Sequence, residues 1–144
     1  MATSKSRIPA RLKRLVIERA NRCCEYCRCQ QRFAVQAFSV EHIIPRRRRG
    51  KSIASNLAFA CQGCNNHKYA KTHAYDPITG VWTPLFHPRR DRWDEHFAWD
   101  ENFALILGLT SIGRATAHAM QLNRDGLVNL SKILFEAGEH LPTF

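Results

Sequence analysis

The 144-residue sequence lacks any long apolar run, and its second half lacks cysteine. A membrane helix needs about 18 consecutive apolar residues, so no membrane partner is expected. The basic segment 1–10 has no apolar region after it. We therefore expect no secretory signal, and we expect a cytoplasmic location. All six cysteines fall between Cys23 and Cys64. Cysteines of proteins that are not secreted are normally kept reduced, so we do not expect a disulfide framework.

Acidic residues are scarce in the first half of the chain. Residues 1–74 contain 16 Lys and Arg but three acids, whereas residues 75–144 contain six Lys and Arg and nine acids. The strong positive charge of the first half predicts a polyanionic partner, although a basic surface can also serve solubility alone. The charge changes sign near residues 76–80, Asp-Pro-Ile-Thr-Gly, which is a turn sequence. We therefore divide the chain into residues 1–74 and an extension, residues 75–144.

The cysteine spacing predicts a metal site. Two pairs each have a two-residue spacer, forming two zinc knuckles: Cys24 with Cys27, and Cys61 with Cys64. Four such thiolates suit a closed, tetrahedral structural Zn²⁺ site. The alternative is a cluster of reduced, buried thiols, and the repeated spacing argues against it. Cys23 and Cys29 are expected to be bystanders.

Periodicity and turn residues predict an α+β fold. Apolar residues at helical spacing predict a basic amphipathic helix over residues 9–20. A β-branched apolar run predicts a strand over residues 37–44, followed by a buried segment at 57–60 and a short helix at 64–71. In the extension we expect strands at 82–86, 92–99 and 103–109, and helices at 110–122 and 125–138, with Thr110 or Ser111 and Asp125 as N-caps.

Three short motifs lie between and within the knuckles. They are Val40-Glu41-His42-Ile43-Ile44-Pro45, Asn56-Leu57 and Cys61-Gln62-Gly63-Cys64-Asn65-Asn66-His67-Lys68. In this order, with the first knuckle before them, they resemble the zinc-knuckle branch of the HNH endonuclease family. The resemblance implies a ββα-metal core carrying an α+β C-terminal extension. It also implies a bacterial or phage enzyme that hydrolyses DNA phosphodiester bonds. Little in the sequence resembles a base-reading module, so we expect low intrinsic sequence specificity, or specificity supplied by a partner.

The resemblance also implies roles for single residues. His42 would be the general base, a task that suits an imidazole near neutral pH. Glu41 and Asn65 would hold a catalytic Mg²⁺ or Mn²⁺ ion, with His67 as the alternative to Asn65 and softer ions then favoured. Asn56 would brace the loop and orient His42. Taken singly, each residue has an ordinary structural interpretation, such as a helix cap or a half-buried histidine. Their joint occurrence favours the site.

A run of cations follows His42 directly. Arg46, Arg47, Arg48, Arg49 and Lys51 are expected to contact DNA phosphates, and Lys68 matches a lysine of the family. The alternative for the arginine run is a solvated loop. Two other functions also remain open: a catalytically inactive zinc-knuckle protein that binds nucleic acid, and a nuclease that cuts RNA.

Overall fold

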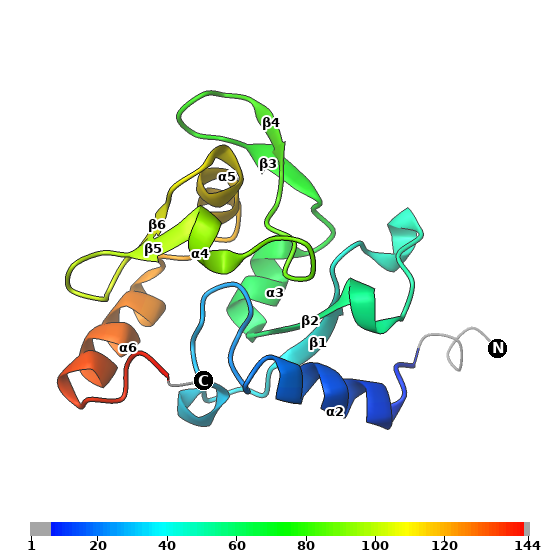
Figure 1. Ribbon diagram of the computed structural model, residues 1–144, viewed down its shortest axis with the longest axis horizontal. Coiled ribbons are helices and arrows are strands. Elements are labelled where there is room, and N and C mark those ends of the chain that lie inside the picture. The colour runs from blue at the N-terminus through cyan, green and yellow to red at the C-terminus, as the bar shows by residue number, and fades with distance from the viewer. Residues whose placement is uncertain (1–6, 143–144) are drawn as a thin grey trace.

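The computed structural model describes residues 7–142, which form helices, short 3₁₀ turns and three two-stranded antiparallel sheets (Figure 1). The helices are α2 (Ala10–Arg19), α3 (Gln62–Lys68), α4 (Trp93–His96), α5 (Ser111–Ala119) and α6 (Asp125–Glu136). The strand pairs are β1 (Ser39–His42) with β2 (Leu57–Ala60), β3 (His73–Tyr75) with β4 (Trp82–Pro84), and β5 (Phe97–Trp99) with β6 (Ile106–Gly108). The fold is α+β, as expected. No helix within residues 7–142 has the length and apolar character needed to cross a bilayer.

The β1–β2 hairpin forms the centre of the first half of the chain. Ser39 lies opposite Ala60 and His42 opposite Leu57. Every residue of β2 is buried because both of its faces are covered. Leu57 and Phe59 pack in one cluster with Val16 of α2, whereas Ala58 and Ala60 pack among the cysteines. Successive residues of a strand point to opposite faces, so one face of β2 packs against α2 and the other face packs against the cysteine knuckles.

Helix α2 lies against this hairpin (Figure 1). Pro9 precedes it with a φ of −59°, which suits the entry to a helix. The fully buried Val16 anchors the apolar side. Arg19 donates a hydrogen bond to the carbonyl of Leu57 at 2.7 Å. The predicted helix over residues 9–20 is therefore confirmed to within one residue at each end.

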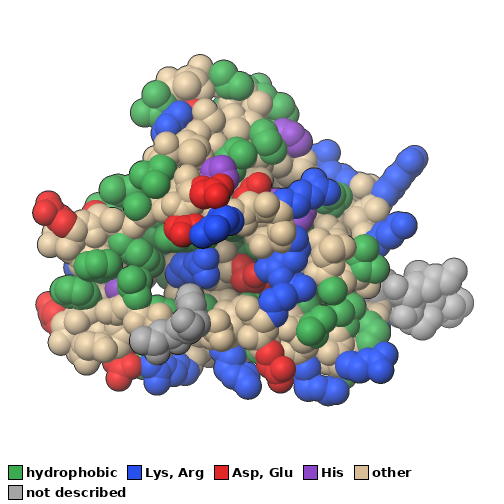
Figure 2. Space-filling view, viewed as in Figure 1, with side chains coloured by type: hydrophobic (Ala, Val, Ile, Leu, Met, Phe, Trp, Pro, Cys, Tyr) green, Lys and Arg blue, Asp and Glu red, His purple; other side chains and the backbone are tan. Residues whose placement is uncertain are grey.

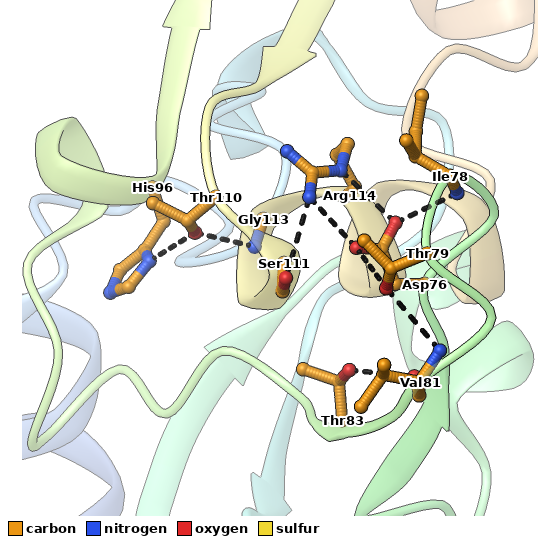
Figure 3. Close-up of polar contacts among 10 residues, drawn as sticks. All are labelled: Asp76, Ile78, Thr79, Val81, Thr83, His96, Thr110, Ser111, Gly113 and Arg114. Atoms are coloured by element: carbon orange, nitrogen blue, oxygen red, sulfur yellow. Dashed lines mark hydrogen bonds and ion pairs between the residues drawn. The ribbon is translucent and has the colours of Figure 1, made fainter.

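A buried ion pair holds the β3–β4 hairpin against α5 (Figure 3). Asp76 is fully buried and accepts two hydrogen bonds from Arg114, at 3.0 and 2.8 Å. It also accepts from the amide of Ile78 and the hydroxyl of Thr79, both in the hairpin turn. The Arg114 guanidinium holds the pKa of the Asp76 carboxyl below its ordinary value. The turn at residues 76–80 is thus fixed by charge-assisted hydrogen bonds.

Two local predictions in the extension are wrong. The strand expected at residues 92–99 is split into helix α4 and strand β5. Asp94 and Glu95 lie in the first turn of α4, where the helix dipole favours acids. Asp125 is the first residue of α6, and Arg124 takes the N-cap position. Thr110 is the N-cap of α5, as expected, and its hydroxyl accepts from the amide of Gly113.

The two segments share one hydrophobic core. Buried Cys24 and Tyr26 lie in the same cluster as Phe86, Phe97 and Met120 of the extension. The Tyr26 and Phe86 rings meet edge to face, with centroids 6.4 Å apart. The extension therefore packs directly on the knuckles.

Candidate functional site

The four knuckle cysteines converge on a single point. Their side chains are buried, and the sulfur atoms of Cys24, Cys27, Cys61 and Cys64 all lie within 4.8 Å of one another. Four sulfurs bound at about 2.3 Å to a tetrahedral Zn²⁺ stand about 3.8 Å apart. The sulfurs of Cys27 and Cys61 are 3.7 Å apart, which matches that geometry. The residues present therefore fit a structural zinc ion.

Local hydrogen bonds shape both knuckles in the same way. The amide of Cys27 points at the sulfur of Cys24 at 3.5 Å, and the amide of Cys64 at the sulfur of Cys61 at 3.4 Å. Strand β2 ends at Ala60 and delivers Cys61 to the N-cap of α3. Each amide stabilises negative charge on the sulfur that it faces, as a metal-bound thiolate requires.

The two remaining cysteines lie outside the set of four. Cys23 donates to the carbonyl of Asn21. Cys29 is half-buried, and its sulfur is 3.3 Å from that of Cys27. The backbone carbonyl of Cys29 accepts from the amide of Cys24, so it helps to close the first knuckle.

The extension contributes a cation to the metal centre. The guanidinium of Arg124 lies 3.3 Å from the sulfur of Cys61 and 3.6 Å from that of Cys64. Gly63 makes room for it, since a Cβ at Gly63 would stand 2.3 Å from a guanidinium nitrogen. A four-thiolate zinc site carries net negative charge, and Arg124 partly offsets that charge.

A second site lies along the open edge of β1. Strand β1 pairs only with β2 among the described residues, and all four of its residues line a hollow of about 570 Å³. The opposite wall comes from α3 and the residues after it, with Asn65 and Tyr69, and from Arg46 and Arg47. His42 and Asn65 thus face one open space.

His42 has two polar neighbours, both at its Nε2 atom. The hydroxyl of Ser52 is 2.8 Å from Nε2, and Nε of Arg46 is 3.3 Å from it. Arg46 also donates to the Ser52 hydroxyl at 3.2 Å. Burial, with smaller contributions from Arg46 and Lys68, lowers the pKa of His42. The imidazole is therefore neutral at pH 7 and able to accept a proton.

Asn56 braces the loop that follows His42. Its carbonyl oxygen accepts from the amide of Ile44 at 2.9 Å, and its amide donates to the carbonyls of Ile44 and Lys51. Gly50 fits beneath, where a Cβ would stand 1.6 Å from the Ile44 oxygen. Asn56 makes no hydrogen bond with the imidazole of His42 itself, so any influence on His42 passes through the backbone.

Helix geometry separates Asn65 from His67. Asn65 and Tyr69, four residues apart, both line the hollow. His67 is two residues from Asn65, so it points away on a helix and does not line the hollow. The structure brings Asn65, rather than His67, towards His42.

Glu41, which also lines the hollow, forms a buried pair with Lys68. Lys68 is 1% exposed and lies 3.1 Å from one oxygen of Glu41, whose other oxygen accepts from the Tyr26 hydroxyl at 3.1 Å. Burial raises the pKa of Glu41 to about 7, with Lys68 and Tyr26 opposing. Lys68 also donates to the carbonyls of His42 and Ile43. In this arrangement the ammonium of Lys68 is enclosed by these acceptors and does not face solvent.

The arginine run forms an exposed turn beside His42. The side chains of Arg46, Arg47, Arg48, Arg49 and Lys51 are all exposed. Residues Arg46–Arg48 form a 3₁₀ turn, and Arg47 donates to the Tyr69 hydroxyl at 2.8 Å. Figure 2 shows Lys and Arg side chains along the right and lower edges of the molecule, over this turn and α2. The turn therefore presents cations next to the hollow.

Sequence reasoning missed Ser52, Tyr69, Tyr26 and Arg124. Each acts across a distance in the chain that no local pattern reports: Arg124, for example, is 60 residues from Cys64. Ser52 had the best local signal, since it lies in the loop that Asn56 was expected to brace.

Comparison with known proteins assigns a family to the segment that contains this site. Residues 24–71 match the family model described as HNH endonuclease. Searches of curated proteins and of solved structures returned no match. The segment 24–71 is an HNH endonuclease domain, and the resemblance predicted from its motifs is confirmed. Its mixed helix and hairpin architecture with four clustered cysteines agrees with the ββα-metal fold.

Proposed function

We propose that this protein hydrolyses DNA phosphodiester bonds in a metal-dependent reaction. One observation carries the proposal: within an HNH domain, His42, Asn65 and an exposed arginine turn border the same hollow. In-line cleavage needs a base to activate water and positive charge to neutralise the phosphate. The hollow offers both. The proposal includes low intrinsic sequence specificity and a cytoplasmic setting in a bacterium or phage.

His42 is the proposed general base. Nε2 of His42 accepts from Nε of Arg46 at 3.3 Å, so in this arrangement the ring proton lies on Nδ1. Nε2 also lies 2.8 Å from the Ser52 hydroxyl, which can donate to it. The unprotonated Nε2 is therefore the atom proposed to take the proton from water, and Arg46 and Ser52 hold the ring for this role.

Asn65 is the proposed protein ligand of the catalytic ion. Its amide oxygen suits Mg²⁺ or Mn²⁺, ions that commonly take few protein ligands and fill the rest with water and phosphate. Such an ion stabilises the charge that develops on the phosphate and on the departing oxygen. Glu41 joins the ligands only if it exchanges Lys68 and Tyr26 for the ion. In the arrangement described, it anchors Lys68, which holds the carbonyls of His42 and Ile43.

Cutting of supercoiled plasmid tests the proposal. We expect nicking with added Mg²⁺ or Mn²⁺, and a loss of about 10²–10⁴-fold in rate for His42→Ala, because the base is removed. His118→Ala is a matched control, since His118 is exposed on α5, away from the hollow. Equal cutting by His42→Ala and the wild type would refute the assignment of the base.

The pH profile of cutting provides a second prediction. Because the pKa of His42 is lowered, the base is deprotonated at lower pH than an ordinary histidine, and single-turnover cutting should reach its plateau at a lower pH than an unperturbed histidine would allow. Arg46→Gln removes a cation that lowers this pKa, so the acid limb should move to higher pH. Arg49→Gln, in the same turn but without a bond to His42, should leave it unmoved. Identical profiles for all three would contradict the electrostatic role of Arg46.

A second candidate function is nucleic-acid binding without cutting. The observation in its favour is that both oxygens of Glu41 already have partners. This reading predicts salt-sensitive DNA binding and no metal-dependent nicking. The plasmid assay therefore separates the two candidates, and a parallel assay on structured RNA tests whether RNA is cut instead.

A further inference from the structure

A second cavity, of about 460 Å³, is lined in part by Arg48 of the arginine turn, whereas Arg46 and Arg47 line the His42 hollow. Its floor is apolar: Ile43, Leu85 and Phe86 are buried, and Ile112 of α5 is half-buried. Its size and its buried apolar residues are typical of sites that bind a small organic group. Neither the knuckles nor the proposed chemistry uses it.

The rim of this cavity is basic. Arg48, Lys71 and Arg90 border it with exposed side chains, against one acid, Asp91. The Asp91 carboxylate already accepts from the amide of His87. Lys68 also borders the cavity, but its ammonium is held by Glu41 and backbone carbonyls. The rim thus presents three cations to an anionic group.

An aromatic surface continues the floor outward. His73 borders the cavity and stacks on Trp82, with ring planes 10° apart and centroids 5.9 Å apart. Trp82 is 58% exposed, although it is large and apolar. Flat aromatic groups beside a basic rim are the usual means of holding unpaired bases.

The cavity and the His42 hollow adjoin along the chain. Ile43 and Ile44 line the cavity, and Ile44 lies two residues after His42, so its Cα is within about 7 Å of that of His42. Arg46 and Arg47 line the hollow while Arg48 lines the cavity. A single strand crossing the arginine turn meets both spaces.

We propose that this cavity binds one unpaired nucleotide of the nucleic-acid strand, with its base on the apolar floor and its phosphate at the Arg48, Lys71 and Arg90 rim. The inference rests on the proposed function, because it places this nucleotide beside the bond to be cut. A nucleotide matches both halves of the cavity: the base has an apolar face, and the phosphate complements the cations. The site therefore favours DNA that carries a bulge, a flap or a mismatch, in which a base is already free.

Equilibrium binding without an added divalent ion tests this proposal independently of cutting. A labelled duplex with one bulged nucleotide is compared with the fully paired duplex. We expect the bulged duplex to bind about 5- to 100-fold more tightly, the range that stacking one base provides. Ile112→Trp fills the cavity and should abolish that preference while leaving the affinity for the paired duplex unchanged.

Lys71→Glu is a second variant, chosen because it changes an exposed side chain and should not disturb folding. It should weaken binding of the bulged duplex more than that of the paired one. Lys132→Glu, an equal charge change on exposed α6, should weaken both equally. Thermal melting followed by circular dichroism checks that each variant is folded.

Two results would overturn the inference: equal binding of the two duplexes by the wild type, or a bulge preference that survives both cavity variants. Displacement of the bulged duplex by free deoxyadenosine monophosphate at similar concentration would assign the cavity to free nucleotides and would also overturn it. If the protein prefers the bulged duplex but does not cut plasmid, the nucleotide-binding proposal stands and the proposed nuclease activity is refuted. If the protein cuts plasmid but does not prefer the bulged duplex, the nuclease proposal stands and the nucleotide-binding proposal is refuted.

Discussion

Replacing Cys24 by serine should unfold the domain. Apparent binding free energies of structural Zn²⁺ sites are about 10–16 kcal/mol, as large as the whole stability of a typical domain. Cys24 lies fully buried in the core that both halves share, so loss of one thiolate leaves a polar group without its metal there. We expect the variant to contain no bound zinc by metal analysis, to lose its cooperative thermal transition and to aggregate.

Cys29→Ser is the matched control. Its sulfur lies beside that of Cys27 but outside the mutually close set of four. This variant should keep about one Zn²⁺ per chain and melt near the wild type. Equal damage from the two substitutions, or retained zinc in Cys24→Ser, would show that the ligand assignment is wrong.

Glu41→Ala should lower the free energy of unfolding by about 3–5 kcal/mol at pH 8, because it leaves the buried ammonium of Lys68 without its carboxylate. Replacing both partners, as in Glu41→Met with Lys68→Met, should recover much of that loss, since two apolar side chains need no partner. Denaturant unfolding of the Glu41→Met variant, the Lys68→Met variant and the double variant, each compared with the wild type, gives the coupling energy between the two residues.

A second substitution of Glu41, to glutamine, tests whether this residue anchors Lys68 or binds the metal ion. If Glu41 holds Lys68, the Glu41→Gln variant keeps a hydrogen bond and should cut with unchanged dependence on Mg²⁺ concentration. If Glu41 instead binds the ion, Glu41→Gln should need much more Mg²⁺, and Glu41→Ala should alter stability little. The second pattern would contradict the anchor role.

The sequence was most informative where chemistry is encoded at short range. The two-residue spacers of the knuckles predicted the cysteine cluster, and the apolar periodicity of residues 9–20 predicted α2. The order of the three motifs predicted the HNH domain. Each of these signals lies within a few residues, where spacing alone constrains geometry.

Long-range pairing explains what the sequence could not reveal. Lys68 resembled a phosphate-binding residue, but its partner is Glu41, 27 positions earlier, and their burial depends on how α3 packs on β1. Glu41 and His42 both line the hollow, but the carboxylate oxygens of Glu41 are held by Lys68 and Tyr26. Residues 92–99 were also ambiguous, because a one-turn helix and a strand follow each other without a break.

The contact of Arg124 with Cys61 and Cys64 has a consequence for biosynthesis. A ribosome completes both knuckles at residue 64, well before Arg124 exists, and chains fold from the N-terminal end as they emerge. A nascent chain can therefore acquire its metal early, but the metal centre remains uncovered and its charge unbalanced until α5 and α6 arrive. Chains that stop before Arg124 should release zinc to chelators faster than chains that include it, so the cysteine cluster reports whether Arg124 is in place.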